Sequence, residues 1–137
     1  MSGRPGVAAR RGRRGRLSRS AEFDRVFRQG RSHGNRVLVL YGFPRADAAP
    51  GAPDEPRLGL SVSRKVGGAV ERNHVKRLLR EAFELEAERL PAGHDVVIVA
   101  RPEARVIAER DGLDGIRTAL AELIDQLRAR VEGERAR

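Results

Sequence analysis

Three stretches of the chain have the pattern of β-strands. Residues 36–43 (RVLVLYGF) are apolar on both alternating sides, which predicts an interior strand. Residues 57–63 (RLGLSVS) have strict period two, with leucine and valine on one face and only glycine and serine on the other. Residues 94–100 (HDVVIVA) form an apolar run, which predicts a buried strand. The almost bare face of 57–63 lets another element or a ligand chain approach the backbone.

Helical patterns lie before, between and after these strands. Residues 20–29 predict a short helix that Ser20 caps and Gly30 ends. A long helix is expected over about 71–90, and a final helix over about 114–131 with one apolar stripe. The order helix, strands, helix, strand, helix predicts a small α+β sandwich around one core.

The remaining segments have no apolar period. Residues 1–16 are rich in glycine, alanine and arginine, and we expect them to form a disordered basic arm. Residues 44–56 contain four prolines and predict a loop. We therefore expect a single α/β domain over residues 17–131, followed by a flexible tail over 132–137.

Composition narrows the class of protein. No apolar run approaches the ~18 residues of a membrane span, so we expect a soluble protein. The chain has no cysteine, which excludes disulfides and thiol nucleophiles and fits a reducing, cytoplasmic compartment. Four phenylalanines and one tyrosine are the only aromatic residues, which excludes extensive base-stacking platforms.

The formal charge of +9 is unevenly distributed along the chain. Residues 1–36 hold eleven arginines against two acidic residues, whereas residues 37–137 are neutral overall. Within this second part, residues 57–80 carry seven basic groups against one acidic group, and residues 81–137 have a net charge of −4. Two basic segments beside an acidic half indicate a polyanionic partner, and nucleic acid is the commonest one for a small cytoplasmic domain.

The start of the long helix is the most informative segment. At 100° per residue its apolar positions form one arc, and the neighbouring arc is polar and mostly cationic. Cations near a helix N-terminus oppose the helix dipole by roughly 0.3 to 1 kcal/mol each, so this arrangement favours a phosphate ligand. The alternative is a solvated face of an amphipathic helix. Asn73 is either a first-turn hydrogen bonder or a nucleotide ligand.

The same segment carries a motif. Arg64-Lys65-Val66-Gly67, followed by Ala69-Val70-x-Arg72-Asn73-x-x-Lys76-Arg77-x-x-Arg80, closely resembles the signature of the protein subunit of bacterial ribonuclease P. Residues 16–32, 57–67 and 94–101 resemble further parts of that family. The resemblance therefore extends from residue 17 to about residue 127.

This resemblance implies an accessory subunit of a ribonucleoprotein endoribonuclease. In that family the protein binds a large catalytic RNA, which removes the 5′ leader from precursor tRNA, and no protein side chain is catalytic. The basic helix and the turn before it contact the RNA. This assigns RNA binding to Arg64, Lys65, Arg72, Asn73, Lys76, Arg77 and Arg80. The leader occupies a cleft between the first helix and the sheet, which by position would be lined by Phe23, Phe27, Arg36, Val37 and Val39.

The resemblance also implies a fold and a set of partners. The fold is a mostly antiparallel sheet of about four strands with helices packed on it, in the order α-β-β-(β)-α-β-α, with a rare left-handed β-α-β crossover. The expected partners are the catalytic RNA subunit and precursor tRNA, with the protein as a monomer in a one-to-one complex with the RNA. Mg²⁺ is expected to serve the RNA-containing holoenzyme, and the protein alone is expected to bind no metal or cofactor tightly.

Two alternatives remain open from the sequence. Phe23 and Phe27 are as well suited to core packing as to stacking on bases. An architectural RNA-binding protein of the ribosomal type, with no role in cleavage, shares every electrostatic feature and differs only in lacking the signature of residues 69–80. A nuclease that uses its own side chains is disfavoured, because the three histidines lie in separate segments without ligand spacing; they are His33, His74 and His94.

Overall fold

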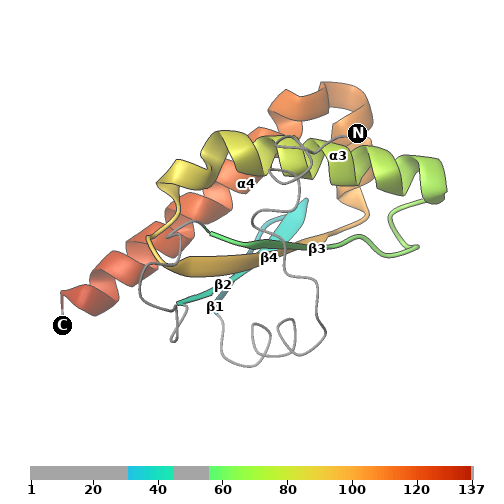
Figure 1. The fold of residues 1–137 in the computed structure, drawn as a ribbon. Helices are drawn as coiled ribbons and strands as arrows, with labels where there is room; N and C mark the ends of the chain where they lie inside the picture. Colours follow the sequence, from blue (N-terminus) through green and yellow to red (C-terminus); the bar gives the residue numbers. More distant parts are fainter. Residues whose placement is uncertain (1–30, 45–55, 137) are drawn as a thin grey trace, which may run out of the picture.

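The computed structural model describes residues 31–44 and 56–136 (Figure 1). The expected basic arm, the expected helix over 20–29 with both of its phenylalanines, and most of the expected 44–56 loop lie outside the described residues. The limits of the domain therefore stay a prediction.

The described residues form one four-stranded sheet in the order β1-β2-β4-β3. Strand β2 pairs antiparallel with both β1 and β4, and β3 pairs parallel with β4. This confirms the mostly antiparallel sheet of an α+β fold. The strands are β1 (Arg31–Gly34), β2 (Leu38–Pro44), β3 (Leu58–Ser61) and β4 (His94–Ala100).

Strand β1 was not expected as a separate strand. Its sequence, RSHG, has no apolar alternation, although the three strands that precede α3 agree with the family order. A turn centred on Asn35 creates the β1–β2 hairpin, because the Asn35 side-chain oxygen accepts hydrogen bonds from the N–H groups of Val37 and Leu38 at 3.0 and 2.9 Å. The amide nitrogen of Asn35 donates to the carbonyl of Ala119 at 3.0 Å, which fixes the turn against the last helix.

Two long helices complete the described part of the chain. Helix α3 (Ala69–Glu86) continues into a short 3₁₀ helix η1 (Ala87–Arg89), close to the expected range of 71–90. Helix α4 (Glu103–Arg135) begins eleven residues before the expected start at 114, and it ends four residues beyond 131, inside the segment expected as a flexible tail. Gly112, with φ of 61°, breaks the helical geometry inside α4, so the helix has two segments.

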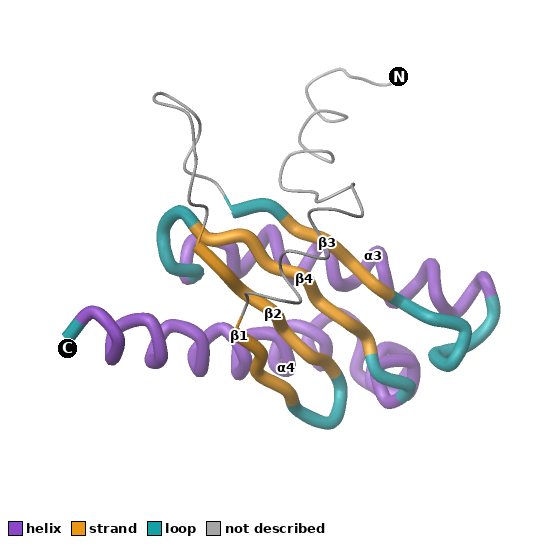
Figure 2. The backbone as a smooth tube through the Cα atoms, turned by 90° about the horizontal axis from the view of Figure 1, so that it is seen from below, coloured by secondary structure: helices purple, strands orange, loops and turns teal. Residues whose placement is uncertain are grey.

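Both helices lie on the same face of the sheet (Figures 1 and 2). The core between them contains Leu38, Leu40 and Ile98 from the sheet, Leu79 from α3 and Leu120 from α4, all fully buried. Helix α3 connects the parallel strands β3 and β4, as the resemblance implied for the β-α-β unit. The hand of this connection stays a prediction. Among the described helices none is long and apolar enough to span a membrane.

The apolar arc of α3 differs from the expected one at its C-terminal end. The helical spacing predicts that Leu85 belongs to this arc together with Val75, Leu78, Leu79, Ala82 and Leu90, but the Leu85 side chain is 51% exposed, and Phe83 is buried instead. The next core-facing position is Glu86, which is 5% exposed. Glu86 occupies that position because arginines from η1 and α4 neutralise its carboxylate, namely Arg89 and Arg117.

Candidate nucleic-acid interface

A fixed turn between β3 and α3 presents the first two basic residues of the motif. The N–H of Val66 donates to the carbonyl of Ser63 at 3.0 Å, which closes the turn. The Val66 side chain is 2% exposed and anchors the turn in the core. Arg64 and Lys65 lie between these two anchors, and both are exposed. Their charges are therefore held outside the core by local backbone geometry.

Two glycines bring this turn close to the start of α3. A Cβ atom added to Gly67 would lie 2.8 Å from the Cβ of Glu71 and 3.1 Å from the Cδ of Arg105, so only glycine allows this approach. The N–H of Gly68 donates to the Glu71 carboxylate at 2.8 Å. Glu71 thus satisfies a backbone donor at the helix start and supplies the one acidic group of the first turn.

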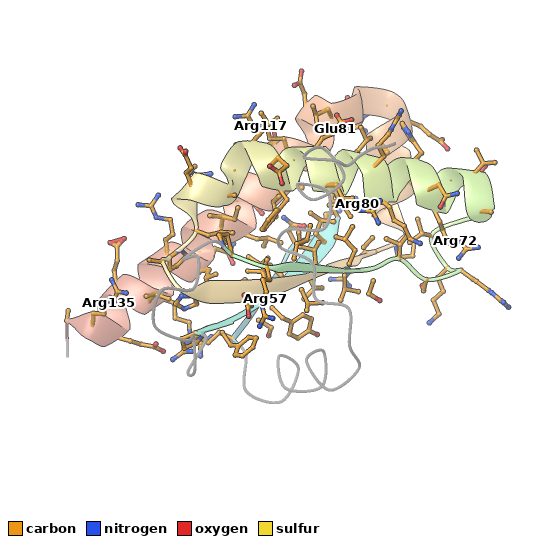
Figure 3. All side chains as sticks on the ribbon, in the orientation of Figure 1. Arg57, Arg72, Arg80, Glu81, Arg117 and Arg135 are labelled. Carbon is orange, nitrogen blue, oxygen red and sulfur yellow. The ribbon has the colours of Figure 1, made fainter. Side chains whose placement is uncertain are left out.

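The basic residues of α3 lie along its N-terminal half, where the helix leaves the turn. Arg72 and Lys76 are half-buried along their side chains, and Arg77 and Arg80 are exposed. Figure 3 shows Arg72 close to the N-terminal end of α3 and Arg80 further along the helix. The turn and the helix together bring five cations and Asn73 to one end of the molecule, with Arg80 next to them along α3.

These cations are not neutralised by carboxylates of the described part of the chain. Within residues 31–44 and 56–136 there is no ion pair to Arg64, Lys65, Arg72, Lys76 or Arg77. Arg77 contacts the Nδ1 atom of His74 at 3.1 Å, and the buried Nε atom of Arg72 has no hydrogen-bond partner within these residues. Cations near a helix N-terminus without local counterions favour binding of an external anion.

Asn73 does not have the structural role that the sequence left open. It is the fifth residue of α3, beyond the first turn, and its side chain is exposed. No hydrogen bond from it to another described residue is present. An amide in this position, between Arg72 and Lys76 in sequence, is available to a ligand.

The residues expected to line the leader cleft do not lie together. Phe23 and Phe27 are outside the described residues. Val39 faces away from α3 and α4, because its neighbours Leu38 and Leu40 point into the core. Val37, in contrast, packs against the core on the helix side.

Arg36 and Val37 instead line an open cavity of about 730 Å³ between the Asn35 turn and the two segments of α4. Val37 and Val39, which were both expected to line the leader cleft, therefore lie on opposite faces of the sheet. The alternation of β2 begins only at Leu38, and the Asn35 turn redirects the residues before it.

The face of the sheet opposite α3 and α4, which we call the far face, has its own small apolar cluster. Phe43 and Val97 are buried there, and Tyr41 and Val99 are partly buried against them. Tyr41 and Phe43 were not named as site residues, although the alternation of residues 36–43 placed Tyr41 on the side of Val39. On β3, Gly59 and Ser61 belong to the same face, as the bare side of the predicted strand indicated.

The histidines do not form a catalytic group. His33 lies on β1, His74 on α3 and His94 at the start of β4. Burial lowers the pKa of the His94 imidazole below its ordinary value of 6.5, and its Nδ1 atom lies 3.2 Å from the carbonyl of Ala92. No cluster of three or more His, Asp or Glu residues suited to a metal ion occurs in the described part of the chain. The geometry of the described residues thus supports anion binding.

Comparisons with known proteins agree with this geometry. A family model described as Ribonuclease P matches residues 12–127. The ribonuclease P protein component of Clostridium acetobutylicum is 46% identical over 86 residues, which cover 63% of this chain and 69% of that protein. The corresponding protein of Desulfovibrio desulfuricans is 43% identical over 113 residues, covering 82% of this chain and 80% of that protein.

Solved structures of such proteins have a similar fold. The ribonuclease P protein of Thermotoga maritima has a TM-score of 0.70 at 31% identity, over 82% of this chain and 97% of that one. The ribonuclease P protein of Staphylococcus aureus has a TM-score of 0.68 at 32% identity, over 81% of this chain and 93% of that one. Both similarities extend over most of the described fold.

Proposed function

The chain belongs to the ribonuclease P protein family, and from this premise we propose that it binds the catalytic RNA of ribonuclease P and the 5′ leader of precursor tRNA in the cytoplasm. By holding both RNAs, it assists removal of the leader and so formation of the mature tRNA 5′ end. Cleavage itself is assigned to the RNA subunit with Mg²⁺, and the protein is expected to act as a monomer in a one-to-one complex.

The observation that carries this proposal is the set of unpaired cations on the β3–α3 turn and on α3. Arg64 and Lys65 are exposed on a turn that Val66 anchors, and Arg72, Lys76 and Arg77 have no carboxylate partner among the described residues. A fixed backbone with cations that have no carboxylate partner among the described residues suits the phosphates of a folded RNA, because the backbone that carries the charges needs no ordering on binding. We assign this surface to the catalytic RNA, with Asn73 and Arg80 as further contacts.

The far face of the sheet is assigned to the leader. Tyr41 provides a partly exposed aromatic ring that packs on the buried Phe43, Val39 lies on the same strand, and β3 adds a surface almost without side chains. A single-stranded RNA can stack a base on such a ring while its backbone passes over small residues. Phe23 and Phe27 stay predicted members of this cleft. Arg36 is a less direct candidate, because it lies on the side of the α4 cavity.

Reconstitution tests the proposal. The protein freed of RNA should not cleave precursor tRNA, whereas addition of its cognate catalytic RNA and Mg²⁺ should restore cleavage. Affinity for the catalytic RNA should fall steeply with rising salt, because several phosphates are neutralised. Cleavage by the RNA-free protein would overturn the assignment of catalysis to RNA. A protein that binds RNA but leaves cleavage by the catalytic RNA unchanged would support the architectural alternative.

A further inference from the structure

The open cavity between the Asn35 turn and the two segments of α4 has no role in the proposed function. Its volume is about 730 Å³, and its lining is mainly apolar. Val37 and Ile107 in this lining pack against the core, and Ala119 is buried. Figure 2 shows the loop between β1 and β2 beside α4. A cavity of this size with an apolar floor suits a small organic ligand or one unit of a larger one.

The walls of this cavity are fixed by contacts within the protein. The side-chain nitrogen of Asn35 donates to the carbonyl of Ala119 at 3.0 Å and to the carboxylate of Glu122 at 3.1 Å, so the turn is tied to α4. A Cβ atom added to Gly115 would lie 2.6 Å from the Cβ of Asp111, so only glycine lets the two segments of α4 approach so closely. A ligand therefore meets a preformed site and orders little of the protein on binding.

Three carboxylates line the cavity, and they differ in what they already contact. Asp111 pairs with Arg110 at 3.0 Å, and Glu122 accepts the hydrogen bond from Asn35. The side chain of Asp114 is exposed, and it forms no hydrogen bond or ion pair with another described residue. Asp114 therefore offers two carboxylate oxygens to a ligand that has neighbouring N–H donors.

A second cavity of about 390 Å³ adjoins the first one, and both are lined by Asn35 and Arg36. The side chain of Arg36 is exposed and has no partner among the described residues. Arg101 lines the second cavity, where its Nη1 atom donates to the carbonyl of Asn35 at 3.1 Å. Glu103 is the acidic residue of this lining. Two guanidinium groups against one carboxylate favour an anionic group such as a phosphate.

We propose that the two cavities form a binding site for a guanosine nucleotide, with the base in the α4 cavity and the 5′-phosphate at Arg36 and Arg101. The N1–H and N2–H groups of guanine are adjacent donors, and they match the two oxygens of Asp114. Adenine has an acceptor at N1 instead, so it would leave this carboxylate without its partner. The base lies on the helix side of the sheet, so the inference is independent of leader binding by the far face.

The first test compares the affinities of the full chain for guanosine monophosphate and adenosine monophosphate by calorimetric titration. The chain has a formal charge of +9 and attracts both nucleotides alike, so the ratio of affinities reports the base. Guanosine monophosphate should bind about 10-fold more tightly, as expected for one bidentate contact to a base. Asp114→Asn should reduce this ratio to less than about twofold.

A second variant tests the phosphate contact separately. Arg36→Gln should weaken binding of both monophosphates about 5-fold, as expected for one charge-assisted contact, and leave their ratio unchanged. Binding of guanosine, which has no phosphate, should change less than about twofold in this variant. A purely structural role of Arg36 would instead lower the affinities for guanosine and its monophosphate by the same factor.

Matched controls place one exposed carboxylate and one exposed arginine elsewhere. Glu81→Gln on α3 should leave the preference for guanosine monophosphate unchanged. Arg64→Gln on the basic turn should change the affinity for either monophosphate less than Arg36→Gln does. If Arg64→Gln causes the larger loss, the nucleotide binds through its phosphate at the basic turn, and the inference is wrong.

The holoenzyme distinguishes the two sources of a guanosine nucleotide. If an unstacked guanosine of the catalytic RNA occupies the site, the holoenzyme should no longer bind guanosine monophosphate, and Asp114→Asn should weaken affinity for the catalytic RNA about 10-fold. If the ligand is the free nucleotide, the holoenzyme should bind it like the protein alone, and Asp114→Asn should leave RNA affinity unchanged. Equal affinities of the wild-type chain for the two monophosphates, or a preference that Asp114→Asn retains, would overturn the inference.

Discussion

The two ends of α3 lie among arginines in opposite electrostatic settings. At the N-terminal half, Arg72 and Arg77 have no carboxylate partner in the described part of the chain. At the C-terminal end, the buried carboxylate of Glu86 accepts a hydrogen bond from Nε of Arg117 at 2.6 Å. Glu86 also forms an ion pair with Arg89, which in turn pairs with Asp125 of α4. The same residue type thus joins two helices at one end and is left available at the other.

The difference shows which arginines the fold needs. Pairing at the C-terminal end offsets the cost of burying Glu86 and connects α3 to α4. No comparable pairing with a described carboxylate compensates the cations Arg72, Lys76 and Arg77 of the N-terminal half, and the helix dipole further disfavours Arg72 close to the first turn. Cations that cost stability and have no carboxylate partner among the described residues are best explained by an external anion.

The largest expected effect follows from removing three cations of α3, of which Arg72 and Lys76 have no carboxylate partner among the described residues. The triple variant Arg72→Ala/Lys76→Ala/Arg80→Ala should reduce affinity for the catalytic RNA on the order of 100-fold at about 0.1 M salt, and flatten the salt slope by about three units. Thermal stability should hold or rise slightly, because cations leave a helix N-terminal half. Salt-dependent binding and thermal unfolding of the same variant measure both effects.

The opposite result for RNA affinity and thermal stability would contradict this interpretation. A triple variant that unfolds early but binds RNA with wild-type affinity would show that this helix face is structural. The distinction between the two ends of α3 would then have no functional meaning.

The next effect concerns the paired end. Glu86→Ala should lower the free energy of unfolding by about 1 to 3 kcal/mol, since it removes the acceptor that joins Arg89 and Arg117. Affinity for the catalytic RNA should change by no more than about twofold, because the site is distant from the basic turn. Denaturant unfolding and RNA binding check this pair of values. A large loss of affinity without loss of stability would contradict the structural role.

A smaller effect is expected from pH. Burial lowers the pKa of His94 below 6.5, so the unfolded chain binds a proton more readily than the folded protein does. The stability that the neutral His94 contributes is therefore fully present above pH 6.5 and is lost as the pH falls through that value towards the lower folded pKa. Unfolding free energies between about pH 7.5 and 5.5 should show this decline.

His94→Asn should flatten that decline, because the variant has no imidazole to protonate. It retains a polar side chain that can reach the carbonyl of Ala92. Glu86 acts in a separate, more acidic window, since its hydrogen bond to Arg117 lowers the pKa of the carboxyl group below 4.5. An unchanged pH profile in His94→Asn would place the responsible group elsewhere.

Some elements of the fold could be predicted from the sequence and others could not. Strand β4 was predicted at residues 94–100 because continuous burial leaves an unambiguous apolar run. Strand β1 was not, since RSHG becomes a strand only by pairing with β2 through the Asn35 turn. The first segment of α4 was also missed, because the two glycines of the sequence ERDGLDG are typical of a loop, whereas Gly112 allows the helix to bend and continue.

The candidate site, like the fold, could be predicted only in part from the sequence. The basic half of α3 could be predicted, since the helical spacing and the family signature are both local. The surroundings of Arg36 and Val37 could not, because they depend on contacts with α4 more than seventy residues away in sequence. The pairing of Arg57 with Asp95 was missed for the same reason: the two residues meet only through the parallel register of β3 and β4.

The smallest expected effect concerns the acidic residues that follow the basic half of α3. Beyond the basic half, Glu81 and Glu84 of α3 and Glu88 of η1 are exposed and form no ion pair with the described residues. Their negative charges repel RNA, so they should limit its contact to the N-terminal half of the helix. Figure 3 shows Glu81 on the outer side of α3.

Replacing all three by glutamine should therefore raise affinity for unrelated RNA about 2- to 5-fold, while affinity for the cognate catalytic RNA rises less, because screening weakens each exposed charge within about 10 Å. The free energy of unfolding should increase by about 0.3 kcal/mol, since anions near a helix C-terminus are unfavourable. Competition binding with cognate and unrelated RNA gives the ratio of affinities. If this ratio stays at the wild-type value, the acidic half has no role in placing the RNA, and the basic half alone determines where RNA binds along α3.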